Sequence, residues 1–394
     1  MVTTTGQFFL NGSGDSANLQ SGQTDIVVNS GSDAAKMTVQ NGDTVYASGS
    51  LDTTVYGANN NIYFSNTASN DTLTLNAGLN TITGYTGSVS GSSVAYNTFV
   101  NVSGGTYNTG AYSTFVNAHD ATIITGNKSQ FSNSNDLTVT TGTDSVFDVF
   151  KNGTLTAGMK TQIHDLENSD ATLGRASHID TANNSHIETV GTDLTVGALK
   201  NSYINEAGTD GTGYGGVSVT GSIQGADTIT AQDVSVLFGT MDNTATLTVD
   251  ASRSGSITGG SGTQSVTQTG SAGLTFISAA GNSGGNFSAT GGTGADTFIA
   301  NSSMTMTGGA GAGNTFDIMR TGAGAADVIK DFTAANNTLD LSGFGLTQSS
   351  FASILDNSTV SSAGLTLHLD SKTTLTLADV SDKSALTSSN VVLS

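Results

Sequence analysis

The sequence predicts an all-β protein, a parallel β-solenoid (β-helix or β-roll) with a β-rich cap at its C-terminal end. Apolar and polar residues alternate in short runs, as at residues 71–75, and this period of two is typical of β-strands. Related segments return at short intervals. Residues 96–101 reappear as 112–117, and Ile229 and Leu247 lie 18 residues apart in similar contexts. Proline is absent, which favours stacked coils whose backbone N–H groups all join ladders.

The composition limits the kind of core that the chain can build. Hydrophobic residues make up 36% and aromatic residues 6% of the 394 residues, which is little for a conventional globular core. Either the chain is largely disordered, or its core is a narrow column that needs few large side chains per coil. Charged residues are only 11% and strand-like runs recur from end to end, so we expect the ordered alternative.

The charge balance excludes several classes of protein. The net charge is −20, so nucleic-acid binding, which requires clustered Lys and Arg, is not expected. No apolar stretch is long enough to span a membrane. Residues 1–10 contain no basic region followed by an apolar core, so we expect no cleaved signal peptide. Cysteine is absent, which is compatible with an oxidising exterior.

We expect three segments along the chain. Residues 1–280 form a degenerate β-solenoid, because their strand-like runs repeat at steps of 16 to 20 residues. Residues 281–332 form glycine-rich, calcium-binding coils. Residues 333–394 form a C-terminal cap, where the spacing of apolar residues predicts a short helix near residues 349–355 and a hairpin between residues 364–369 and 374–378.

Residues 291–299 match the nonapeptide G-G-x-G-x-D-x-U-x, in which U is a large apolar residue, here Phe298. Glycines let the backbone turn so that carbonyl oxygens converge, and the aspartate adds a carboxylate; such hard oxygen ligands suit Ca²⁺. Asp296 and Asn314 are 18 residues apart, which is one turn of such a roll, so we expect them on adjacent coils. Shorter G-x-D-x-U pieces occur at residues 142–146 and 225–229. The expected ion is Ca²⁺, and its candidate ligands are Gly292, Gly294, Asp296, Asn314, Asp317 and Asp327.

The C-terminal third resembles the RTX (hemolysin-type calcium-binding repeat) proteins, which bacteria export by type I secretion. The resemblance rests on the nonapeptide, on A-D-V-I-K-D-F at 326–332 and on L-D-L-S-G-F at 339–344. In that family, calcium repeats are followed by a D-x-I-x-D-F segment, an I-D-L-S-G segment, terminal hairpins and an apolar tail. The resemblance covers about residues 281–394. It implies export from a Gram-negative bacterium through a one-step channel with an uncleaved C-terminal signal, and hence a secreted or cell-surface protein.

These features favour an extracellular, non-catalytic structural protein that assembles into a surface layer, a filament or a biofilm matrix, with Ca²⁺-dependent folding or assembly. Its expected partner is itself, in a head-to-tail homopolymer, because the open strands at the ends of a solenoid must be capped or paired. A cell-surface or matrix polysaccharide is a further candidate partner.

Two alternatives remain open: a secreted adhesin or glycan-binding β-helix, and a β-helical enzyme that degrades polysaccharides. Residues 1–280 contain no H-E-x-x-H motif. The densest set of potential metal ligands follows no known metal spacing. It comprises His164, Asp165, Glu167, His178, His186 and Glu188.

Overall fold

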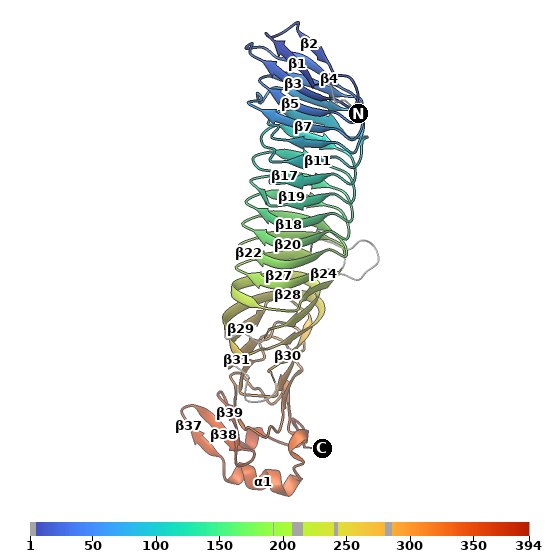
Figure 1. Ribbon diagram of the computed structural model, residues 1–394. Helices are drawn as coiled ribbons and strands as arrows, with labels where there is room; N and C mark the ends of the chain where they lie inside the picture. Colours follow the sequence, from blue (N-terminus) through green and yellow to red (C-terminus); the bar gives the residue numbers. More distant parts are fainter. Residues whose placement is uncertain (1–4, 192, 207–215, 240–242, 280–285, 394) are drawn as a thin grey trace. The chain divides into compact units, whose positions relative to one another are not determined.

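A computed structural model describes residues 5–191, 193–206, 216–239, 243–279 and 286–393. Strands make up 54% and helices 4% of the chain, and the strands wind into a parallel β-solenoid of about 16 turns (Figure 1). The predicted fold class is therefore confirmed. The chain divides into two compact units, Met1–Glu188 and Thr189–Ser394. The boundary predicted between residues 280 and 281 lies outside the described residues.

The first unit is built from two walls of short parallel strands, which we call wall A and wall B. Wall A comprises β1 (Thr5–Leu10), β3 (Thr24–Asn29), β5 (Thr44–Ser48), β7 (Asn61–Ser65), β9 (Thr81–Thr83), β11 (Thr98–Val100), β13 (Thr114–Val116), β15 (Gln130–Ser132), β18 (Val146–Lys151), β20 (Gln162–Glu167) and β22 (His178–Asn183). Wall B comprises β2 (Ser16–Asn18), β4 (Ala35–Val39), β6 (Leu51–Val55), β8 (Thr72–Leu75), β10 (Ser88–Gly91), β12 (Thr106–Thr109), β14 (Thr122–Ile124), β17 (Thr138–Thr141), β19 (Thr154–Ala157) and β21 (Asp170–Gly174). Two further strands are β16 (Ser134–Asn135), which pairs with β18, and β23 (His186–Val190), which contains the division between the units.

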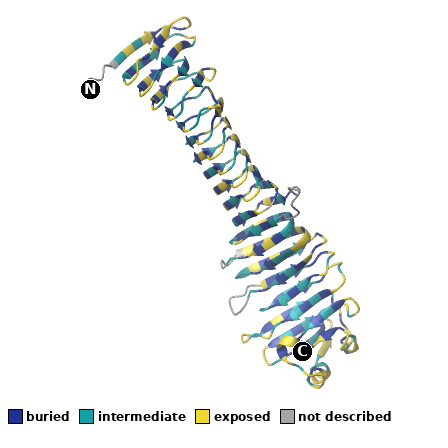
Figure 2. Cartoon of the chain, turned by 90° about the vertical axis from the view of Figure 1, so that its right-hand side faces the viewer, coloured by how far each residue is buried: buried dark blue, intermediate teal, exposed yellow. Residues whose placement is uncertain are grey.

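The core of the first unit is a column of side chains that stack from coil to coil. Buried residues alternate with more exposed ones along most strands (Figure 2), as expected when every second side chain points inward. In β18, β20 and β22 the two buried positions are three residues apart. In wall A, Phe99, Phe115, Phe131 and Phe147 stack with ring centroids 4.9, 5.1 and 4.4 Å apart. The predicted repeat of residues 96–101 at 112–117 is confirmed by the pairing of Phe99 with Phe115. This narrow column explains how a chain with few aromatic residues builds a continuous core.

Corners between the walls are made by residues in the left-handed conformation. Asn101, Asn117 and Asn133 have φ values of 52°, 54° and 57°, a region that asparagine tolerates better than most residues. Their side chains form a ladder on the surface: Nδ2 of Asn117 donates to Oδ1 of Asn101 at 2.9 Å, and Nδ2 of Asn133 donates to Oδ1 of Asn117 at 2.8 Å. Each corner is thus tied to the next coil.

The second unit continues the same construction with strands of more variable length. Its parallel strands are β24 (Leu194–Lys200), β25 (Tyr203–Glu206), β26 (Gly216–Val219), β27 (Ile223–Leu237), β28 (Asn243–Thr258), β29 (Gly262–Gln268), β30 (Gly273–Ile277), β31 (Asn286–Thr290), β32 (Thr297–Ala300), β33 (Met304–Thr307), β34 (Asn314–Ile318), β35 (Ala325–Ile329), β36 (Asn337–Asp340) and β40 (Val391–Val392). Phe276, Phe298 and Phe316 stack in its core with successive centroid distances of 5.0 and 5.0 Å. Phe298 therefore occupies the inward position that the nonapeptide predicts.

A β-rich cap ends the second unit. It contains the 3-10 helices η1 (Ser342–Phe344) and η2 (Lys383–Ala385), the helix α1 (Gln348–Asp356) and the strands β37 (Thr359–Ser361), β38 (Gly364–His368) and β39 (Thr373–Leu377). β38 pairs antiparallel with β37 and β39, and β39 pairs parallel with β35, which joins the cap to the solenoid. The predicted helix and hairpin are both confirmed. Thr347 caps α1 by accepting a hydrogen bond from the N–H of Ser350 at 3.2 Å.

Candidate corner site and surface grooves

Asp296 lies at a coil corner immediately before β32, and only 1% of the residue is exposed. Its Oδ1 accepts a hydrogen bond from the N–H of Leu274 in the preceding coil at 2.7 Å, and its Oδ2 accepts one from the N–H of Gly292 at 3.0 Å. Burial raises the pKa of this carboxyl, while the two N–H donors act in the opposite direction. The carboxylate thus satisfies two backbone donors that the corner would otherwise leave without partners.

The glycines of the nonapeptide allow successive coils to approach closely. A Cβ on Gly291 would lie 2.6 Å from the carbonyl oxygen of Gly308 in the following coil, and a Cβ on Gly294 would lie 2.4 Å from the carbonyl oxygen of Ala272 in the preceding coil. The carbonyl oxygen of Gly292 accepts an N–H from the following coil at 3.1 Å. Backbone packing between coils therefore requires glycine at 291 and 294 whether or not an ion is bound.

Asn314 occupies the same corner in the next coil, so the predicted placement of Asp296 and Asn314 on adjacent coils is confirmed. Oδ1 of Asn314 accepts the N–H of Asp296 at 2.8 Å. Its Nδ2 donates to the carbonyl oxygens of Gly308 and Gly311, each at 3.2 Å. A neutral amide therefore lies between carbonyl oxygens at this corner and satisfies them with its two N–H groups.

The first unit uses the same device without a nonapeptide. Asp43 accepts hydrogen bonds from the N–H of Gln23 at 3.3 Å and from the N–H of Gln40 at 3.0 Å. Asn60 matches Asn314, since its Nδ2 donates to a carbonyl oxygen of its own turn at 3.0 Å. Small buried polar residues continue this corner column through the following coils, namely Asn80, Asn97, Ser113, Ser129, Ser145, Thr161 and Ser177. A polar side chain that closes the corner is thus a general feature of this solenoid.

Whether these residues fit calcium depends on how many oxygen atoms they leave available as ligands. Calcium sites in proteins supply about six to eight oxygen ligands, usually with several carboxylates. At this corner Asp296 contributes one carboxylate whose two oxygens already accept hydrogen bonds, and Asn314 directs an amide N–H₂ group at the carbonyls. In the described residues no three His, Asp or Glu side chains lie close enough to hold a metal ion together. With these hydrogen bonds in place, the side chains of Asp296 and Asn314 do not form a calcium site, and calcium binding here stays a prediction.

Asp317 and Asp327 do not join this corner. Asp317 lies further along β34, the strand that begins at Asn314, and Asp327 lies on β35, which pairs with β33 and β39. Asp317 faces outward from β34 in register with Asp340, and burial together with the Asp340 charge raises its pKa. Asp327 is buried in β35, where Oδ1 accepts the N–H of Met304 at 3.0 Å and Oδ2 has no hydrogen-bond partner. Burial raises the pKa of Asp327 to about 7. Of the six predicted ligands, the structure therefore brings together Gly292, Gly294, Asp296 and Asn314.

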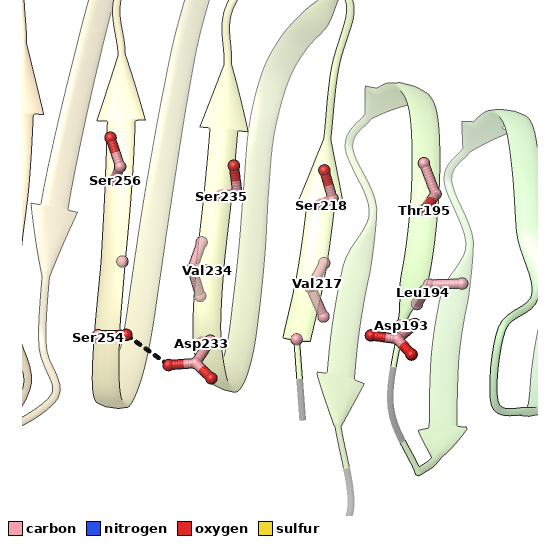
Figure 3. A pocket seen from close by; sticks show the side chains of 12 residues that line it. Asp193, Leu194, Thr195, Val217, Ser218, Asp233, Val234, Ser235, Ser254 and Ser256 are labelled. Atoms are coloured by element: carbon pink, nitrogen blue, oxygen red, sulfur yellow. Dashed lines mark hydrogen bonds between the residues drawn. The ribbon is translucent and has the colours of Figure 1, made fainter. Parts of the chain in front are cut away.

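A shallow groove of about 460 Å³ crosses the outer surface of β24, β26, β27 and β28 in the second unit. Four hydroxyls from these neighbouring strands, Thr195, Ser218, Ser235 and Ser256, lie in a row along it (Figure 3). Asp233 lies at one edge, where it accepts hydrogen bonds from Arg253 and Ser254. The Arg253 guanidinium holds the pKa of Asp233 below its usual range. The arrangement offers hydrogen-bond donors and acceptors at regular intervals across the strands.

A second groove of about 430 Å³ lies on wall B of the first unit. It is lined by Thr138 and Thr154 on one side and by Asn152 and Asn168 on the other. Its lining is almost entirely polar and uncharged, apart from Asp136 and Asp170. The groove therefore presents hydroxyl, amide and carboxylate groups.

Sequence reasoning did not single out the corner column or these rows of hydroxyls. The signal for the column was the return of Asp, Asn or Ser immediately before a strand, at steps of 16 to 20 residues. The signal for the rows was the repeated T-x-T or S-x-S tripeptide, as in residues 72–74, 88–90, 138–140 and 154–156.

The fold and these surfaces define the chain as a parallel β-solenoid protein with polar, hydroxyl-rich outer faces. No protein-family model, curated protein or solved structure matches the chain. Within the described residues, α1 and the two 3-10 helices are far too short to cross a membrane.

Proposed function

We propose that this chain is an extracellular, non-catalytic structural protein that assembles with copies of itself into a surface layer, a filament or a biofilm matrix. The observation that carries the proposal is the edge of β1. This strand pairs with β3 along one side, and it has no second partner among the described strands. Phe9, on the same strand, is 76% exposed. An edge of unpaired N–H and C=O groups beside an exposed aromatic ring favours strand pairing with another chain.

The cap contains a second free strand edge, which could pair with the β1 edge of another copy in a head-to-tail assembly. β37 pairs only with β38 among the described strands, all three of its residues are exposed, and Val360 is 43% exposed. A contact between two different edges is heterologous, so it does not close on itself and extends into an open polymer. This geometry supports the head-to-tail homopolymer that we expect from the sequence.

The extracellular location rests on the resemblance of residues 281–394 to RTX proteins and on the net charge of −20. An acidic surface keeps isolated copies soluble and is compatible with divalent cations outside the cell. We derive no step of assembly through calcium, because the hydrogen bonds of Asp296 and Asn314 already close their corner.

The groove shown in Figure 3 favours one alternative function, binding of a neutral polysaccharide by a secreted adhesin. Hydroxyls one strand apart, about 4.8 Å from each other, suit an extended chain of sugar rings. The Asp233 carboxylate, already paired with Arg253, offers no attraction to an acidic polymer.

Assembly can be tested by negative-stain microscopy and sedimentation of the purified chain. We expect ordered polymers for the wild type and mainly single copies for Phe9→Asp, which places a charge beside the β1 edge. Leu237→Asp is the matched control, since Leu237 is an exposed residue (51%) on an outer face of the second unit. Single copies of the wild type that bind neutral oligosaccharides would favour the adhesin, and release of reducing sugar would favour an enzyme.

A further inference from the structure

Wall B carries two rows of outward-facing side chains that are small and polar except for Ile124. The first row is Thr72, Ser88, Thr106, Thr122, Thr138 and Thr154, and the second row, two residues further along each strand, is Thr74, Ser90, Asn108, Ile124, Thr140 and Thr156. β8, β10, β12, β14, β17 and β19 pair in parallel without a shift of register. The rows therefore form a regular two-dimensional array.

The dimensions of this array follow from strand geometry. Neighbouring strands are about 4.7–4.9 Å apart, and residues two apart on one strand are separated by roughly 6.6–6.8 Å. Each threonine presents a methyl group and a hydroxyl that donates and accepts hydrogen bonds. The array thus repeats hydroxyl groups at fixed intervals in both directions, except at Asn108 and Ile124 in the second row.

Three hydroxyls of the first row are free to meet an external partner, whereas that of Thr72 donates to Asp52 at 2.8 Å and that of Ser88 accepts the N–H of Thr106 at 3.4 Å. Thr122, Thr138 and Thr154 are exposed, and their hydroxyls have no hydrogen-bond partner within the described residues. In contrast, the buried Thr125 and Thr141 use their hydroxyls inside the protein, on Ser129 and Ser145. The exposed threonine hydroxyls can therefore bind an external partner, whereas those of the buried Thr125 and Thr141 cannot.

The array also stands out against the charge and the composition of the rest of the chain. Neither row contains an ionisable residue between β8 and β19, although the net charge is −20. Asp52 and Asp170 continue the first row on the neighbouring strands β6 and β21. Threonine is common on strands because of its β-propensity, and the outward row of wall A in the same coils begins with Thr81, Thr98 and Thr114 but continues as Gln130, Val146 and Gln162. In the coils of Thr138 and Thr154, strand formation alone therefore does not require an outward hydroxyl.

We propose that the two rows of wall B bind the surface of ice. The prism face of hexagonal ice is a flat, uncharged lattice of oxygen atoms whose two repeats are close to the strand spacing and to the two-residue spacing of the rows. A rigid array with matching repeats can hydrogen-bond many lattice positions at once without losing side-chain freedom.

A protein partner fits this face less well. Protein interfaces are enriched in aromatic residues, Met and Arg and depleted in Ser, and neither row contains an aromatic residue or Arg. The inference is independent of self-assembly, which uses the edge of β1.

The test is an ice-recrystallisation assay of the full chain, with thermal hysteresis as a second readout. We expect the wild type to inhibit recrystallisation, and Thr138→Lys and Thr154→Lys each to lose that activity, because a long charged side chain lifts the face off the lattice. Gln130→Lys is the matched control, since Gln130 is exposed on wall A of the same coil as Thr138. Circular dichroism and the melting temperature identify any variant that fails to fold, and the second lysine variant then decides.

Wild-type protein without activity on ice would overturn the inference, as would full activity of both folded lysine variants. If the lysine substitutions instead disrupt contacts between copies above 0 °C, the face belongs to an interface and the inference fails. Binding of wild-type protein, but not Thr138→Lys, to crystalline cellulose in the absence of any effect on ice would assign the face to polysaccharide.

Discussion

The backbone N–H of Asp296 donates to Oδ1 of Asn314 at 2.8 Å, so the two residues occupy the same corner of consecutive coils. The two side chains act in the same direction, because each accepts an N–H of the coil before it: Asn314 from Asp296, and Asp296 from Leu274. Asn60 and Asn80 repeat this arrangement in the first unit, where the N–H of Asn60 donates to Oδ1 of Asn80 at 3.0 Å. At these Asp and Asn positions the corner column therefore links consecutive coils independently of the walls, whereas Ser113, Ser129 and Ser145 bond within their own turns.

Replacing Asp296 by alanine should destabilise the second unit. Two buried N–H groups, those of Leu274 and Gly292, would lose their acceptor, at a cost of about 1–3 kcal/mol each. Urea unfolding in EDTA and in Ca²⁺ measures the loss. Because hydrogen bonds alone close this corner, we expect the same loss in both buffers. A larger loss in Ca²⁺ would instead restore the predicted calcium role of Asp296.

Replacing Phe131 by alanine should cost about 3–5 kcal/mol of unfolding free energy. Phe131 is 1% exposed and stacks between Phe115 and Phe147, so the substitution leaves a cavity and removes two ring contacts. Urea unfolding followed by circular dichroism measures this. Phe9→Ala serves as the control and should change the free energy of unfolding by less than about 0.5 kcal/mol, because Phe9 is exposed. Equal effects of the two substitutions would contradict the buried column.

The stability should fall as the pH rises from 5 to 8, in part through Asp327. Burial raises the pKa of Asp327 from 3.8 to about 7, so the folded chain holds this proton more tightly than the unfolded chain. The stabilising contribution is complete below pH 3.8 and is lost as the pH passes through 7. Its size is at most about 4 kcal/mol. Urea midpoints at several pH values should show a shallower decline for Asp327→Asn than for the wild type; parallel profiles would exclude Asp327 as a source.

Asn117→Ala should lower the stability of the first unit more than Asn117→Gly. Asn117 has a φ of 54°, where a residue with a Cβ is disfavoured by roughly 1–2 kcal/mol and glycine is not. Both substitutions remove the ladder contacts with Asn101 and Asn133, so the difference between them isolates the backbone term. Thermal melting of the three proteins provides the comparison, and identical melting temperatures for the two variants would argue against a left-handed corner.

Much of the fold was predictable because each strand is recognisable from its own short stretch of sequence. Alternation identifies which side chains point inward, and the short step of the repeat predicts stacking, as the pairing of Phe99 with Phe115 confirms. Register in the irregular coils was not predictable. Ile229 pairs with Val249, not with Leu247, because the local step is 20 residues (249 − 229) instead of 18. The lengths of the turns decide this step, and alternation carries no information on them.

The candidate site was predictable in its placement and less so in its chemistry. The spacing of 18 residues places Asp296 next to Asn314, as found. The shorter piece at residues 142–146 does not reproduce that corner: Asp144 has a φ of 58° and is exposed, while the buried Ser145 closes the turn through Gly142 at 3.3 Å. A motif states which residues are present, but the position of the corner decides which of them points inward.

The regular part of the corner column has a consequence for how such a chain changes length. Asn97, Ser113, Ser129, Ser145, Thr161 and Ser177 follow one another at intervals of 16 residues. Duplication or deletion of one complete 16-residue block therefore leaves every inward, outward and corner position matched to its neighbours. Gain or loss of any other number of residues there disturbs the alignment, so this region can evolve in whole-coil increments.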